Sequence, residues 1–247
     1  MVNAFSFCLY GPENPYYYRG LLENIWLAGK YFPTWKVYVY LGSDVPHTMR
    51  EWLAACSTVV LRDTGITGPR NMAYRFFAID EPDVELMLVR DADSRIHWKD
   101  RWAIREFLKH PEYIGHAIRD NVVHKVELCG GLWGMRKIPG INIQELRNRY
   151  ESDYLASGKP ILNGYDQTFL AFYVYPILAP RILIHYSNGC LLRGEVGVEF
   201  PFGWNNETFC GRGETEVFLD VPDPAPIVPP AKSIVDSLPR GVIRLPN

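Results

Sequence analysis

The first hundred residues alternate between two hydrophobic patterns, and this alternation limits the possible folds more than any other feature. Short runs rich in β-branched and aromatic residues, typical of strands, occur at 4–10, 35–41, 57–61 and 84–90. In the segments between them, 16–32, 46–56 and 69–79, apolar residues recur every three or four positions, as in amphipathic helices. Strands that alternate with helices predict βαβ units and a central, mostly parallel sheet flanked by helices, which is the α/β class.

The alternation is less regular after residue 93. Segments 101–110, 141–157 and 165–178 have helical patterns, whereas 112–118, 129–136 and 181–186 are typical of strands. The stretch DVPDPAPIVPPAK at 220–232 is dense in proline, which can form neither a helix interior nor a central strand. We therefore expect one domain over residues 1–219, followed by an extended tail or linker at 220–247 that could lead into a longer protein.

Composition and charge exclude several classes of protein. The formal net charge is −2 without a block of like charges, so no nucleic-acid partner is expected. The five cysteines form no CxxC pair, which favours reduced thiols. The longest apolar stretch, FLAFYVYPILAP, is far shorter than the ~20 residues that cross a bilayer, and the N-terminus lacks the basic segment of a signal peptide. We expect a soluble, cytoplasmic protein with no integral membrane segment.

Two aspartates, Asp91 and Asp93, follow the apolar run LMLVR. In extended backbone, residues i and i+2 point to the same side, so the two carboxylates can converge. Carboxylate oxygens suit Mg²⁺ or Mn²⁺, and ligands of open α/β sheets bind outside the carboxyl ends of the strands. Aspartate is also common in turns and as a helix cap. The pair therefore indicates either a divalent-metal site or a turn.

Five separated segments carry a resemblance to a known family. FSFCLYG, YRFFAIDEPDVELMLVRDADSRI, GGLWGM, GYDQTFL and IHYSN follow one another in this order. With them the chain resembles GT-A-fold glycosyltransferases, and more narrowly small transferases of bacterial surface-glycan clusters and large DNA viruses. The resemblance implies a Rossmann-like sheet and a strand-terminal DxD motif that binds the metal of a nucleotide-sugar diphosphate. The chain from about residue 190 onward lies outside it.

The resemblance also assigns roles to individual residues. Asp93 matches the more direct metal ligand, Asp91 a ligand shared with the donor, and His185 a third, imidazole ligand. A mixed set of this kind suits Mn²⁺ somewhat better than Mg²⁺. Asp166 and Gln167 match an Asp-Gln pair at a helix start beside the anomeric carbon of the donor sugar. A core histidine at 185 and a helix cap at 166 are the structural alternatives.

Four further residues are candidates for contacts with the nucleotide. Arg75 and Arg90 are candidates for the diphosphate, because a guanidinium pairs bidentately with phosphate. A surface ion pair is the alternative for either arginine. Tyr10 and Gly11, at the end of the first strand, are placed to contact a nucleobase.

The stretch CGGLWGM and the aspartate before it are candidates for sugar contacts. Gly131 would let a sugar approach the backbone closely, and the indole of Trp133 can stack on a pyranose face. A bulged strand with a core tryptophan is the alternative. Asp120 could accept hydrogen bonds from sugar hydroxyls or be an ordinary turn aspartate. The tyrosines of PYYYRG are expected on the amphipathic face of a helix rather than in a groove.

The expected function is glycosyl transfer from a nucleoside-diphosphate donor, with Mn²⁺ or Mg²⁺ as cofactor and a glycan or glycoprotein hydroxyl as acceptor. The resemblance implies a UDP-sugar, and the Asp-Gln pair with the C-terminal histidine matches the retaining layout. Residues 1–98 would form the nucleotide-binding half and 99–219 the donor-sugar and acceptor half. A virus-encoded chain would act in the host cytoplasm.

Two alternatives belong to other classes of protein. The first is a non-catalytic sugar- or nucleotide-binding protein of the same fold. The second is a haloacid-dehalogenase-type phosphatase, because LMLVRDAD superficially fits the hhhhDxD motif of that class. In that class, however, the first aspartate follows the first core strand, whereas three βα units precede the motif here.

Overall fold

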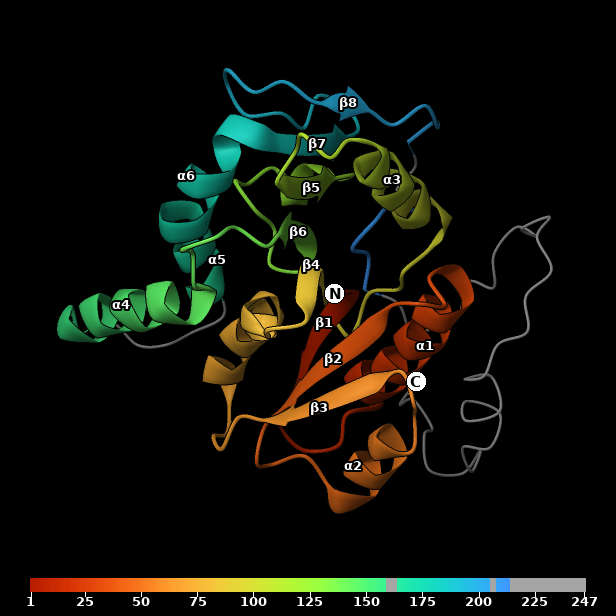
Figure 1. The fold of residues 1–247 in the computed structure, drawn as a ribbon, viewed down its shortest axis with the longest axis vertical. Helices are drawn as coiled ribbons and strands as arrows, with labels where there is room; N and C mark the ends of the chain where they lie inside the picture. The colour runs from red at the N-terminus through yellow and green to blue at the C-terminus, as the bar shows by residue number, and fades with distance from the viewer. Residues whose placement is uncertain (159–163, 205–207, 214–247) are drawn as a thin grey trace.

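A single eight-stranded sheet runs through the computed structural model, which describes residues 1–158, 164–204 and 208–213. The strand order is β3-β2-β1-β4-β6-β5-β7-β8 (Figure 1). The strands are β1 (Val2–Leu9), β2 (Lys36–Leu41), β3 (Val59–Asp63), β4 (Val84–Arg90), β5 (Gly115–Arg119), β6 (Leu132–Arg136), β7 (Ile182–Tyr186) and β8 (Val198–Glu199). Only β6 is antiparallel to its neighbours, β4 and β5. The predicted α/β class is confirmed, while the expected tail at 220–247 lies outside the described residues.

Helices cover both faces of the sheet, as Figure 1 shows. They are α1 (Pro15–Tyr31), α2 (His47–Ala54), η1 (Pro69–Asp80), α3 (Trp98–Lys109), η2 (Val122–His124), α4 (Ile143–Ala156), α5 (Tyr165–Phe169), η3 (Leu170–Val174), α6 (Tyr175–Leu178) and η4 (Ala179–Arg181). None of the helices in the described part of the chain is long and apolar enough to cross a membrane.

Alternate residues of β1 belong to two separate hydrophobic clusters. Phe5, Phe7 and Leu9 pack with residues of α1, α2 and α3, whereas Ala4 and Cys8 pack with residues of η1, α5 and η3. This follows from the two-residue period of a strand, which sends successive side chains to opposite faces. A strand that is apolar on both faces needs cover on both, so the sequence pattern itself requires helices on either side.

Two predicted helices differ from regular α-helices. The segment expected at 69–79 is a 3₁₀-helix, Pro69–Asp80. Its buried residues include Ala73, Phe76 and Ile79, which are spaced by three as in a helix with three residues per turn, although neighbours such as Phe77 are buried as well. The helix expected at 165–178 contains a π-helical turn, Leu170–Val174, just before Pro176. Proline lacks the N–H that a continuous α-helix needs, and a π turn accommodates such an interruption.

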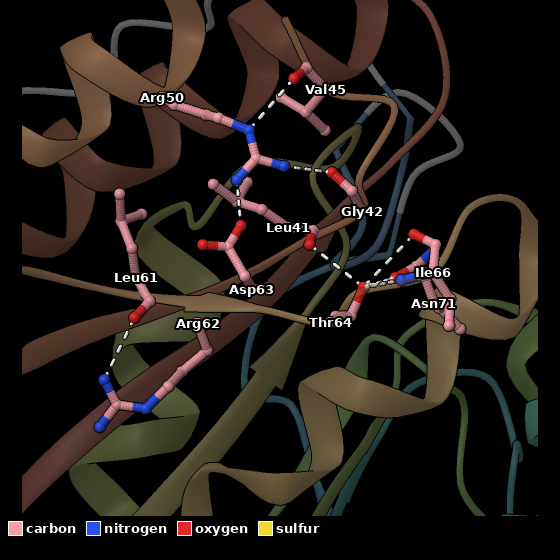
Figure 2. A network of polar contacts seen from close by, with 10 residues as sticks. All are labelled: Leu41, Gly42, Val45, Arg50, Leu61, Arg62, Asp63, Thr64, Ile66 and Asn71. Carbon is pink, nitrogen blue, oxygen red and sulfur yellow. Dashed lines mark hydrogen bonds and ion pairs between the residues drawn. The ribbon is translucent and has the colours of Figure 1, made fainter. Parts of the chain in front are cut away.

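A polar network fixes the loops that follow β2 and β3 (Figure 2). Arg50 of α2 donates from Nε to the carbonyl of Val45 (3.2 Å) and from Nη2 to that of Gly42 (2.5 Å). The Thr64 hydroxyl donates to the carbonyl of Leu41 at 3.1 Å and also contacts Asn71 of η1. Both loops are thereby held beside the end of β1.

Candidate active site at the ends of β1 and β4

A cavity of about 400 Å³ lies where the carboxyl ends of β1 and β4 meet. The chain passes from β1 outward to β2 and β3 on one side, and β4 then pairs with β1 on the other. Ligands of open α/β sheets bind at such a change of direction. The residues that line the cavity are Cys8, Leu9, Tyr10, Tyr17, Met72, Arg75, Asp91, Ala92 and Asp93.

Asp91 and Asp93 both line this cavity, directly after the last residue of β4. The Asp91 carboxylate forms an ion pair with Arg75. Burial, together with the neighbouring Asp91 charge, raises the pKa of Asp93 to about 6, although Arg75 and Arg95 act in the opposite direction. The two carboxylates therefore line one partly desolvated cavity and repel one another there, so that a cation between them would be stabilised.

Arg75 joins this pair to a third carboxylate. Its Nη1 contacts Asp91, and its Nη2 lies 2.9 Å from Oδ2 of Asp166 at the start of α5. Burial opposes the charged form of Arg75, but the surrounding acidic groups, Asp91 foremost, raise its pKa. Two carboxylates, Asp91 and Asp166, thus share one buried guanidinium, and Asp93 lies within its electrostatic reach. We refer to Arg75, Asp91, Asp93 and Asp166 as the acidic corner, because negative charge is in excess there.

Two glycines make room for the acidic corner. A Cβ at Gly131 would lie 2.0 Å from Oδ2 of Asp91, and one at Gly130 would lie 2.7 Å from Nη2 of Arg75. The antiparallel pairing of β6 with β4 brings these glycines to this edge of the sheet, since Leu132 lies opposite Arg90. From the sequence, Gly131 was expected to let a sugar approach the backbone closely. In the structure the close neighbours are the side chains of the acidic corner.

Several residues of the site were missed or set aside by sequence reasoning. Tyr17 of α1 lines the cavity, and burial with the charges of Asp93 and Asp91 raises its pKa. Burial and the Asp91 charge raise the pKa of Cys129 to about 11, and the Gln167 amide lies beside its thiol. In the sequence, only the PYYYRG motif drew attention to Tyr17, and its pattern favoured the amphipathic face of a helix over a binding groove.

Tyr10 and Gly11 both lie at the end of β1, but only Tyr10 lines the cavity. Gly11 has a positive φ of 83° and its carbonyl accepts a hydrogen bond from the Tyr18 hydroxyl at 2.8 Å. Gly11 therefore forms the turn that directs the chain from β1 into α1, since such a φ favours glycine.

Arg90 and Trp133 lie in the interior instead of lining the cavity. Arg90 is 2% exposed and forms a bidentate ion pair with Asp100 of α3, at 2.9 and 2.7 Å. The indole of Trp133 is fully buried, with its ring centroid 5.5 Å from that of Phe76. Trp133 is a core tryptophan, as in the structural alternative considered from the sequence, whereas Arg90 forms an ion pair in the interior and not at the surface. We do not propose either as a donor contact.

His185 and Asp120 are also fully buried. His185 lies 2.9 Å from His116 through Nδ1, while its Nε2 is buried without a hydrogen-bond partner among the described residues. Asp120 accepts hydrogen bonds from Ser187 and from the backbone N–H of Cys210, so both of its carboxylate oxygens are engaged. Neither residue lines the cavity around the acidic corner. We therefore propose neither as a metal ligand or a sugar contact.

The acidic corner fits a divalent cation with two protein ligands. The described residues contain no cluster of three or more His, Cys, Asp or Glu side chains able to hold a metal. Asp91 and Asp93 would supply two oxygens, and the remaining ligands would be water and phosphate oxygens, as is usual for Mg²⁺. The preference for Mn²⁺ depended on an imidazole ligand. Without His185 the donor set is all oxygen and suits either ion.

No family model and no curated protein matches this chain. Among solved structures, it is similar to a glycosyltransferase involved in glycosylation of the major capsid of PBCV-1, with 17% identity and a TM-score of 0.45 over 74% of this chain and 82% of that one. The glycosyltransferase GlyE of Streptococcus pneumoniae TIGR4 aligns with 15% identity and a TM-score of 0.48, over 74% of this chain and 45% of GlyE.

A 4-diphosphocytidyl-2C-methyl-D-erythritol synthase from Anaerococcus prevotii aligns with 9% identity and a TM-score of 0.42, over 75% of this chain and 87% of that one. The similar structures therefore include an enzyme that is not a glycosyltransferase. This likeness concerns the fold and does not define an activity, for which the geometry of the cavity is the evidence.

Proposed function

We propose that this chain is a metal-dependent glycosyltransferase that moves a sugar from a nucleoside-diphosphate donor, UDP being the expected nucleotide, to a hydroxyl of a glycan or glycoprotein. The acidic corner in the cavity between β1 and β4 carries this proposal. Its excess negative charge would repel a bare diphosphate and would attract one that is bound to a divalent cation. The resemblance of the five sequence segments supplies the sugar-transfer chemistry.

The residues of the cavity, and Asp166 and Gln167 behind Arg75 and Cys129, have distinct proposed roles. Asp91 and Asp93 hold the metal, which when bound acts as a Lewis acid on the leaving diphosphate. Arg75 orients Asp91 and Asp166 through its two ion pairs, and its guanidinium is the candidate contact of the diphosphate. Tyr10 is the candidate contact of the base. Asp166 and Gln167 start α5, from which we propose that they face the donor sugar.

The Arg75–Asp166 ion pair also links the two proposed halves of the domain. Arg75 belongs to the nucleotide half, residues 1–98, and Asp166 to the sugar and acceptor half, residues 99–219. Because the pair is buried on both sides, the nucleotide and sugar subsites would be held at a fixed spacing. Correct spacing of reacting groups is a large part of enzymatic rate enhancement.

The primary test is metal-dependent hydrolysis of nucleotide sugars by the purified protein. We expect slow release of nucleoside diphosphate from at least one donor with Mn²⁺ or Mg²⁺, and none with EDTA. Asp93→Ala should weaken metal affinity at least tenfold, and Asp91→Asn should chiefly weaken donor binding. Glu85→Gln, which removes an exposed carboxylate from β4, is the matched control and should change neither.

Other outcomes of this assay would favour the alternatives. Metal-dependent binding of nucleotide sugars without turnover across the donor panel would indicate a non-catalytic binding protein. Release of phosphate from a generic phosphomonoester, abolished by Asp91→Asn, would indicate a phosphatase. Against the phosphatase, Asp91 follows the fourth strand in chain order and is ion-paired to Arg75.

We propose retention of configuration at the anomeric carbon, since Asp166 and Gln167 start α5 as the Asp-Gln pair of the retaining layout does. The anomeric coupling constant of the isolated product, measured by proton NMR, tests this directly. A product with the opposite configuration to the donor would contradict it and would require a carboxylate base beside the acceptor.

A further inference from the structure

A short C-terminal segment crosses the carboxyl edge of the sheet from the end of β5 toward the acidic corner. We call this segment, residues 208–213, the strap. At one end the Phe209 ring lies 5.7 Å from that of His124 in η2. At the other end Gly213 forms an isolated antiparallel bridge with Ser94, the residue after Asp93. The strap thus joins two strand ends that the sheet order separates.

Asp120, the residue after the end of β5, holds the strap in place through hydrogen bonds. Its Oδ2 accepts hydrogen bonds from the backbone N–H of Cys210 at 3.0 Å and from Lys99 Nζ at 3.3 Å. Its Oδ1 accepts from the Ser187 hydroxyl at 2.5 Å, and its backbone carbonyl accepts from the Trp204 indole at 2.8 Å. The fully buried Asp120 carboxylate holds each of these hydrogen-bond partners in position, because a buried negative charge without its partners would be strongly destabilising.

The far end of the strap lies beside Asp93, one of the residues that line the cavity. A Cβ added at Gly213 would lie 1.9 Å from the Tyr16 hydroxyl oxygen and 3.6 Å from Oδ2 of Asp93. The backbone of the strap therefore passes beside the Asp93 carboxylate and leaves no room for a side chain toward Tyr16. This contact also contributes to the burial of Asp93, whose carboxylate is the more direct proposed metal ligand.

We propose that the strap forms one wall of the acidic corner, and that Asp120 is the positioning residue that holds it there. Asp120 then acts on the metal site through the Cys210 N–H and the strap, without contacting metal or donor. The proposal rests on the proposed function only in naming the ligands, a divalent cation and a nucleoside diphosphate. It assigns a role to Asp120, a predicted sugar-binding carboxylate that is fully buried and does not line the cavity.

Two variants test this, one at each end of the strap. Asp120→Ala combined with Lys99→Met removes the anchor together with its buried counter-charge, so that no unpaired charge remains. Gly213→Ala adds a methyl group at an exposed position where it would overlap the Tyr16 hydroxyl, so that the strap and Tyr16 must move apart. Glu151→Ala is the matched control, because it removes a largely buried carboxylate from Arg70 and Arg147 and contacts no strap residue.

Each variant is assayed for tryptic cleavage between Arg212 and Gly213, followed by mass spectrometry, and for its affinity for Mn²⁺ alone and Mn²⁺ with UDP. In the Asp120 variant we expect cleavage at least tenfold faster than in the wild type and Mn²⁺ affinity at least fivefold weaker. Gly213→Ala should weaken Mn²⁺ affinity similarly at unchanged unfolding midpoint. Adding Tyr16→Phe should restore part of that affinity, because it removes the closest contact.

Cleavage at the wild-type rate in the Asp120 variant would overturn the anchoring role. Unchanged Mn²⁺ affinity in Gly213→Ala, or an equal loss in Glu151→Ala, would overturn the role of the strap as a wall of the metal site. A wild-type protein that binds Mn²⁺ but no nucleoside diphosphate would contradict the proposed function, while the comparison of Mn²⁺ affinities would still decide the role of the strap.

Discussion

The small size of Gly131 leaves room for the side chain of Asp91, a proposed metal ligand. A Cβ there would lie 2.0 Å from Oδ2 of Asp91 and 2.8 Å from its backbone nitrogen, both well inside contact distance. The side chain of Asp91 would have to rotate away from Arg75. The same methyl group added at Gly29 of α1 meets nothing within 4 Å. An alanine at position 131 therefore tests steric crowding of Asp91, whereas an alanine at position 29 tests helix propensity without crowding.

We predict that Gly131→Ala lowers metal-dependent donor binding at least tenfold. Gly29→Ala should leave binding unchanged and raise the free energy of unfolding by about 0.5–1 kcal/mol, since alanine is the better helix former. Isothermal titration with Mn²⁺ and UDP and urea unfolding measure the two effects. Full donor affinity in Gly131→Ala would show that Asp91 does not need its present position.

Arg75 offers a second test at the scale of one residue. Lysine keeps the charge but presents a single ammonium, which cannot reach Asp91 and Asp166 as a planar fork does. We predict that Arg75→Lys lowers turnover at least tenfold with a small loss of stability. Arg75→Met should also destabilise the fold, by about 3 kcal/mol, because it leaves buried carboxylates uncompensated. Equal turnover in wild type and Arg75→Lys would contradict the bridging role.

At the scale of elements, α1 presents Tyr17 to the cavity, and its start is fixed by a cap. The Asn14 side chain accepts a hydrogen bond from the backbone N–H of Tyr16 at 3.0 Å, and Pro15 occupies the first helical turn. Both are common devices for starting a helix. Because Tyr17 lies within the first turn, fraying at this end would move it directly.

We predict that Asn14→Ala lowers the free energy of unfolding by about 1 kcal/mol, whereas Asn14→Ser changes it little, since serine also caps. Donor affinity should fall with Asn14→Ala as well as with Tyr17→Ala, and the serine variant should restore it. Thermal unfolding and donor titration of the three variants provide the measurement. A stability loss in Asn14→Ala with unchanged affinity would show that Tyr17 does not contact the ligand.

Two helices show which features of elements a local pattern misses. Apolar spacing at 69–79 predicted a helix, and a helix forms, but its 3₁₀ geometry follows from packing Ala73 and Phe76 into the core. Over 165–178 the pattern predicted the extent of the helix, while Pro176 requires the π turn before it. In both cases the hydrophobic period identified the element, and the packing and backbone chemistry determined its geometry.

At the scale of the whole molecule, His116 and His185 connect β5, β7 and α3 in the core. Both are fully buried, and their rings contact Phe107 and Trp102 of α3. Burial lowers the pKa of His185 to about 4, with Glu106 opposing and His110 adding to the shift. Burial and the neighbouring His185 also lower the pKa of His116. The folded protein therefore keeps this pair neutral at pH values where exposed histidines are protonated.

We predict a loss of stability as the pH falls from about 6.5 toward 4. In this window the unfolded chain binds protons at both histidines and the folded chain does not, so protons favour unfolding. The free energy of unfolding should fall by up to about 1.4 kcal/mol per pH unit for each histidine. Below about pH 6, Asp93 offsets part of this fall, because its raised pKa makes the folded chain bind a proton there before the unfolded chain does. Urea unfolding at pH 7.5, 6 and 5 measures it. His47→Gln, at an exposed position, should show the same slope, and a flat profile in the wild type would contradict the prediction.

The sequence by itself determined the α/β class, the positions of most strands and helices, and the placement of Asp91 and Asp93 at the end of a buried strand. These are local properties, because they follow from the hydrophobic period and from the point at which it stops. Tertiary structure alone decided that Arg75 bridges Asp91 and Asp166, that Gly131 makes room for Asp91 and Gly130 for Arg75, and that Arg90, Trp133, His185 and Asp120 are buried instead. Contacts between residues far apart in the chain depend on which strands pair and which faces meet, and no local pattern encodes them.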